Sequence, residues 1–170
     1  MDPELSVEVQ RQVSAAEGWL GLGSITAAND ELEEIPAAMR AHPKVLLVRL
    51  LIYSEAKKWE ACLDIANAIV RVAPEMEDAW LRRSFALHEL KRTKDAYDFL
   101  LPALERFKDA WLIPYNLACY SCQLGRIPEA ENWLSQAFEI GGNDAKCAAI
   151  DDEDLEPLWQ SRNGSVWKAT

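Results

Sequence analysis

Small residues recur at steps of 34 along the chain, and this regularity constrains the fold more than any other feature. The members of this column are Ala28, Cys62, Ala96 and Ala130. A second column, four residues further on, is mostly leucine and consists of Leu32, Ala66, Leu100 and Leu134. A small residue at the crossing of two helices lets their axes approach closely. The spacing therefore predicts four copies of one closely packed helical hairpin.

Apolar residues within each copy follow a helical period. The third copy shows this in two segments, with Trp80, Phe85, Leu87 and Leu90 in the first and Ala96, Leu100, Ala103 and Leu104 in the second. Breaks between the two segments also recur, at Gly23, Lys57-Lys58, Lys91-Arg92 and Gly125-Arg126. Pro36 and Pro102 fall inside second segments, where we expect a kink or an early helix end because proline removes a backbone donor.

A helix-turn-helix unit of this length resembles the tetratricopeptide repeat (TPR) family. The matching residues are Tyr53, Pro74, Trp80, Ser84, Ala96, Leu117, Ala118, Gly125 and Ala130. Arg49 and Arg83 stand where the family prefers Leu, and Cys62 where it prefers Ala. The resemblance implies an all-α fold, a right-handed superhelix of about four TPR hairpins with a C-terminal capping helix. The chain looks like small bacterial proteins made almost entirely of such units.

The expected organisation is a single array over residues 1–150. Its repeats are expected at about 10–42, 43–76, 77–110 and 111–142, followed by a capping helix at 143–150. Residues 151–170 are expected to form an acidic C-terminal segment and tail. Leu155, Leu158 and Trp159 are expected to cap the array. The alternatives are that they fold back into its groove or dock into a neighbouring molecule.

The charge balance limits the classes of partner. The chain has 28 acidic and 18 basic residues, a formal charge of -10. Nucleic acid and anionic membranes both attract basic surfaces, so neither is expected as a partner. The N-terminal residues lack the apolar run of a secretory signal, and no stretch reaches the roughly 18 apolar residues of a membrane span. These features favour a cytoplasmic protein.

The TPR resemblance implies that the first helix of each hairpin lines a concave, partner-binding face. The candidate residues are Leu47, Leu51, Ser54, Glu55, Leu81, Phe85, His88, Glu89, Leu112, Tyr115, Cys119 and Cys122. This apolar face with an acidic surround predicts a partner peptide or amphipathic helix with apolar anchors and basic flanks. The alternative is that adjacent repeats use the same residues to pack on each other. Lys44 and Asn116 alone do not form the carboxylate clamp of some TPR proteins.

The predicted function is therefore a non-catalytic scaffold or adaptor without a cofactor. One alternative is a chaperone for secreted proteins, since type III secretion chaperones are acidic, of similar length and built on such repeats.

An alternative from another class is a thiol or metal site at Cys119 and Cys122, which are spaced as in a C-x-x-C motif. A structural zinc site needs four ligands, and no second ligand pair is present at the required spacing. No catalytic fingerprint occurs, so we predict no metal and no enzymatic activity.

Overall fold

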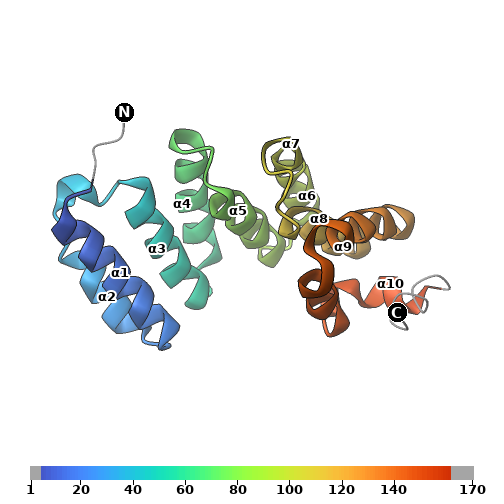
Figure 1. Cartoon of the computed structure of the whole chain (residues 1–170), viewed down its shortest axis with the longest axis horizontal. Helices are drawn as coiled ribbons and strands as arrows, with labels where there is room; N and C mark the ends of the chain where they lie inside the picture. Colours follow the sequence, from blue (N-terminus) through green and yellow to red (C-terminus); the bar gives the residue numbers. More distant parts are fainter. Residues whose placement is uncertain (1–4, 162–170) are drawn as a thin grey trace. The chain divides into compact units, whose positions relative to one another are not determined.

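The computed structural model describes residues 5–161, and every regular element within that range is a helix (Figure 1). The chain divides into two compact units, Met1–Ala86 and Leu87–Thr170, with the boundary inside helix α5 (Glu77–Glu89). The all-α class expected from the sequence is confirmed.

The first unit consists of two helical hairpins and the start of α5. The elements in order are α1 (Val7–Gly21), α2 (Ile25–Glu33), the short 3-10 helix η1 (Ala37–Met39), α3 (Pro43–Glu55) and α4 (Trp59–Val72). Helix α1 packs on α2 and α3 on α4. One buried cluster joins α1, α2 and α3 through residues such as Ala16, Leu32 and Val48. A second joins α3, α4 and α5 through Leu50, Ala66 and Ala79.

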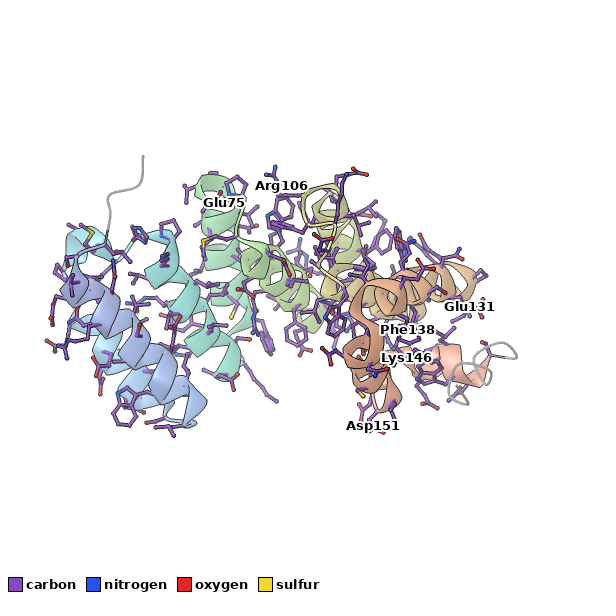
Figure 2. The ribbon with its side chains drawn as sticks, in the orientation of Figure 1. Glu75, Arg106, Glu131, Phe138, Lys146 and Asp151 are labelled. Carbon is purple, nitrogen blue, oxygen red and sulfur yellow. The ribbon has the colours of Figure 1, made fainter. Side chains whose placement is uncertain are left out.

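The second unit begins with the end of α5 and contains one longer hairpin. Its further elements are α6 (Thr93–Leu100), α7 (Ala103–Arg106), α8 (Leu112–Gln123), α9 (Ile127–Ile150), the 3-10 helix η2 (Glu153–Leu155) and α10 (Glu156–Gln160). Helix α9 breaks at Gly142, whose φ of 54° and ψ of -127° are not helical. Phe138 lies on the part before this kink, and Lys146 and Asp151 follow it (Figure 2). The part after the kink is the helix expected to follow the last hairpin.

The second helices start at Ile25, Trp59, Thr93 and Ile127, so the 34-residue spacing of the sequence is also the spacing of the hairpins. The small column lies where helices cross, and each of its residues is at most 1% exposed. Larger side chains at these positions would push the paired helices apart. The hairpin prediction is therefore confirmed.

All four hairpin turns place one residue in the left-handed conformation. The residues and their φ values are Gly23 (75°), Lys57 (54°), Lys91 (62°) and Gly125 (73°). After each of them, a backbone N–H donates to the carbonyl five residues earlier at 2.9 Å: Ser24 to Trp19, Lys58 to Tyr53, Arg92 to Leu87 and Arg126 to Ser121. This is the Schellman pattern, which satisfies carbonyls at a helix end. Two glycines and two lysines therefore carry out the same backbone role.

Both prolines shorten their helices as expected. Helix α2 ends at Glu33, before Pro36. Helix α6 ends at Leu100, before Pro102, and α7 begins directly after that proline. Proline cannot donate to the helical ladder and crowds the preceding turn, which explains both early ends.

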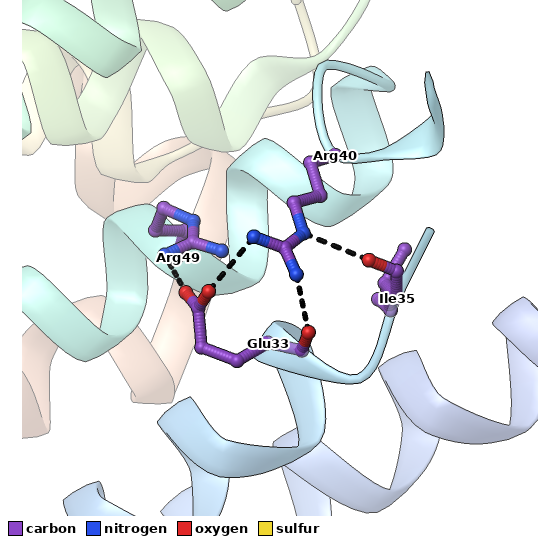
Figure 3. A network of polar contacts seen from close by, with 4 residues as sticks. All are labelled: Glu33, Ile35, Arg40 and Arg49. Atoms are coloured by element: carbon purple, nitrogen blue, oxygen red, sulfur yellow. Dashed lines mark hydrogen bonds and ion pairs between the residues drawn. The ribbon is translucent and has the colours of Figure 1, made fainter. Parts of the chain in front are cut away.

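The two arginines that depart from the TPR pattern have local partners. Glu33 accepts from Arg49 and from Arg40, each at 2.9 Å, and so ties α2 to α3 (Figure 3). Arg40 also donates to the carbonyls of Glu33 and Ile35. Arg83 is 8% exposed, and its guanidinium lies 4.8 Å from the centre of the Trp80 ring. An ion pair and an aromatic face therefore replace the apolar contact that Leu would make.

Candidate functional site

A pocket of about 400 Å³ opens on the first-helix face of the first unit. Its walls come from α1 and α3, together with Leu5 and Met76. The apolar lining is Leu5, Val13, Leu47 and Met76, and the polar lining is Gln10, Ser14, Glu17 and Lys44. Of the residues predicted for the binding face, Leu47 lies in this pocket. Its size suits one or two apolar side chains of a partner.

The other predicted residues of the first unit differ in exposure. Leu51 and Ser54 are half-buried, and Glu55 is exposed. Leu81 is only 9% exposed and belongs to the core. Phe85 is 36% exposed, and its ring meets Trp59 edge to face at 5.5 Å. Leu51, Ser54, Glu55 and Phe85 therefore keep surface that a partner could contact.

In the second unit, the C-terminal segment lies on the face of α8 predicted to be concave. Tyr115, Cys119 and Cys122 are at most 6% exposed. Helices η2 and α10 pack on α8, and Leu155 and Leu158 are fully buried. Residues 152–160 pack on both helices of the last hairpin, α8 and α9, and cover α8 residues that were predicted to line the groove. The three α8 residues can therefore meet a partner only when this segment moves away.

Four polar contacts hold the segment on this face. The Tyr115 hydroxyl donates to Oδ2 of Asp152 at 2.6 Å, and the Cys119 thiol points to the same oxygen at 3.6 Å. Gln123 Nε2 donates to the carbonyl of Asp154 at 3.0 Å. His88 Nε2 lies 3.2 Å from Oδ2 of Asp154.

Two groups that the sequence did not place in the candidate site, Asp152 and Asp154, thus complete this contact. The signal in the sequence is the acidic run at 151–154, placed directly before Leu155. The remaining predicted residues of this unit are Glu89, half-buried, and Leu112, 39% exposed. A partner-binding role for the predicted residues stays a prediction.

The environment of Cys119 and Cys122 does not favour thiol chemistry. Burial, together with the carboxylates of Asp152 and Asp154, raises the pKa of the Cys119 thiol well above its usual range. Burial raises the pKa of Cys122 to about 11, although the backbone of Leu158 opposes that shift. A reactive or metal-binding cysteine needs a thiolate near neutral pH. Among residues 5–161, no three His, Cys, Asp or Glu side chains are grouped so that they could hold a metal ion.

No helix in the described range combines the length and the apolar character that crossing a membrane requires. No protein-family model and no curated protein matches the chain.

Solved structures share the fold. A thermophilic TPR protein of Thermus thermophilus superimposes with a TM-score of 0.72 at 19% identity, covering 89% of this chain and 82% of that one. The structure of MamA MSR-1 C2 gives a TM-score of 0.67 at 20% identity, over 80% of this chain and 78% of that one. A further MamA structure gives a TM-score of 0.70 at 13% identity, and the match covers 95% of this chain and 85% of that one. Together with the 34-residue hairpins, these similarities show that the chain has the fold of the tetratricopeptide repeat proteins.

Proposed function

We propose that the protein is a non-catalytic interaction module that binds a peptide or an amphipathic helix of another protein on its first-helix faces. The observation that carries this proposal is the pocket between α1 and α3, where Leu47 and Val13 form part of an apolar lining with polar groups beside it. Such a pocket accepts an apolar anchor side chain. Helical repeats offer extended surfaces of this kind for partners.

The chemistry of the partner follows from the lining and the charge of the chain. The apolar walls select Leu-like or aromatic anchors. The formal charge of -10 favours Lys or Arg beside those anchors. Electrostatic complementarity of this kind speeds association and discriminates between partners. The four free cysteines fit a reducing compartment such as the cytoplasm.

The test is partner capture with wild type and two matched variants. Leu47→Glu places a carboxylate in the pocket, while Val72→Glu makes a similar change at an exposed apolar residue, 58% accessible, at the end of α4. Captured proteins are identified by mass spectrometry and retested as purified components. We expect wild type and Val72→Glu to retain a partner that Leu47→Glu loses, with equal helical circular dichroism for all three. Equal retention by all three would refute a binding role for the pocket.

A further inference from the structure

One stripe of α8 presents hydrogen-bond donors to the C-terminal segment. Tyr115, Cys119 and Gln123 are spaced four residues apart, so they lie on the same side of the helix. His88 of α5 contacts the segment as well. The three α8 side chains all donate, and the groups that receive them on the segment are the Asp152 carboxylate and the Asp154 carbonyl. The face is therefore suited to an acidic segment.

The covering segment has the character of a short linear motif. Helix η2 has three residues and α10 has five, lengths that do not hold a helical conformation in isolation. Its shape therefore depends on its contacts with α8 and α9. Leu155 and Leu158 are fully buried, while Glu153 and Glu156 are exposed. Two leucine anchors three residues apart follow the acidic run 151–154, and the segment packs on α8 and α9 as a docking peptide would.

We propose that this α8 face is a recognition site for a partner segment of the type Asp-x-Asp-Leu-x-x-Leu, and that the chain's own residues 152–158 occupy it until such a segment displaces them. This inference rests on the proposed function and gives the second unit its own partner chemistry. The first-unit pocket favours basic flanks, whereas the α8 face selects carboxylates. The two faces thus bind different segments.

Tethering explains how the site is controlled. A segment attached to the same chain competes with an effective concentration of about millimolar. A free segment of equal intrinsic affinity must therefore reach that concentration, or carry further contacts, before it displaces the tethered one. Loss of the two leucine anchors removes the competitor and leaves the donors of α8 in place.

The experiment uses the full chain and a fluorescein-labelled synthetic peptide with the sequence of residues 151–160. Binding is measured by fluorescence anisotropy to wild type and to Leu155→Ala/Leu158→Ala. We expect the variant to bind the peptide at least tenfold more tightly than wild type, because the tethered copy competes only in wild type. A peptide with Asp152 and Asp154 changed to asparagine should bind the variant at least fivefold more weakly.

Absence of peptide binding to a variant with wild-type circular dichroism, or equal binding to both chains, would overturn the proposal. If the variant loses its helical signal, hydrogen exchange on wild type decides instead. Amides of residues 155–160 must then exchange at least tenfold faster than those of α8. Exchange of both segments at one common rate would make residues 152–158 a permanent part of the core.

A wild-type dimer in light scattering that the double variant abolishes would assign the site to a second copy of the chain and so overturn the partner assignment. Partner capture by the pocket that contains Leu47 is tested with a different variant, Leu47→Glu. The proposed function of that pocket can therefore succeed or fail independently of the proposal for the α8 face.

Discussion

The two lysines in left-handed turns give the sharpest prediction for stability. Lys57→Gly and Lys91→Gly are each expected to stabilise the protein, whereas Gly125→Ala is expected to destabilise it. The four turns use the same backbone conformation, with φ between 54° and 75°. A Cβ added at Gly125 would meet no atom within 4 Å, so its cost is conformational and not steric.

The magnitude follows from two opposing terms. A side chain with Cβ in the left-handed region costs about 1–2 kcal/mol. Glycine recovers this energy but loses more backbone entropy on folding, about 0.5–1 kcal/mol. Each Lys→Gly change should therefore raise the free energy of unfolding by about 0.5–1 kcal/mol, and Gly125→Ala should lower it by a similar amount. For a chain of this size the melting temperature would move by roughly 1–4 °C.

The assay is urea unfolding followed by circular dichroism, with Lys57→Ala as the matched control. Lys57→Ala removes the same charge and side chain but keeps Cβ, so it should not stabilise. Opposite signs for Lys57→Gly and Gly125→Ala, with unchanged urea dependence, are the expected result. Equal stabilisation by Lys57→Gly and Lys57→Ala would refute the backbone explanation, because the effect would then come from the lysine side chain.

Three further experiments test the packing, the charges and the thiols. Gly141→Ala should destabilise by about 1–3 kcal/mol, because its Cβ would lie 2.5 Å from Cγ of Trp111; an unchanged urea midpoint would contradict that close packing. The hydrogen bond and charge of Arg49 lower the pKa of Glu33. The stability that ionised Glu33 gives to the fold is therefore complete above the ordinary glutamate pKa, and it is lost as pH falls through the lowered pKa of Glu33. The melting-temperature gap between wild type and Glu33→Gln should therefore close in strong acid, and a constant gap would contradict this. Titration with a thiol reagent should show one fast cysteine, the exposed Cys147, and a second fast thiol would contradict the burial of the others.

The hairpins can be predicted because their signals are local. Small residues at helix crossings and the turn residues repeat with one period, so each copy supports the interpretation of the next. The start of α1 is less clear from the repeats, which place it near Gln10. The structure begins the helix at Val7, where the Ser6 side chain accepts from the Val9 amide at 3.3 Å. The pocket wall includes Leu5, just before this helix, and Gln10 within it.

The sequence raises the covering of α8 only as one alternative, because it depends on contacts between residues far apart in the sequence. Tyr115 and Asp152 are 37 residues apart and meet only after the chain bends at Gly142. The sequence shows an apolar face on α8 and an apolar cluster around Leu155, and both interpretations are sound locally. Only the folded structure shows that the cluster around Leu155 covers the apolar face of α8.

The most direct test of the central claim, that a first-helix face binds a partner segment, is a calorimetric titration of a captured partner's purified segment. Burying one leucine-sized anchor contributes about 1.5–3 kcal/mol, which corresponds to roughly tenfold or more in affinity. We predict saturable binding to wild type and Val72→Glu, and at least tenfold weaker binding to Leu47→Glu. The same affinity for all three proteins would contradict the claim.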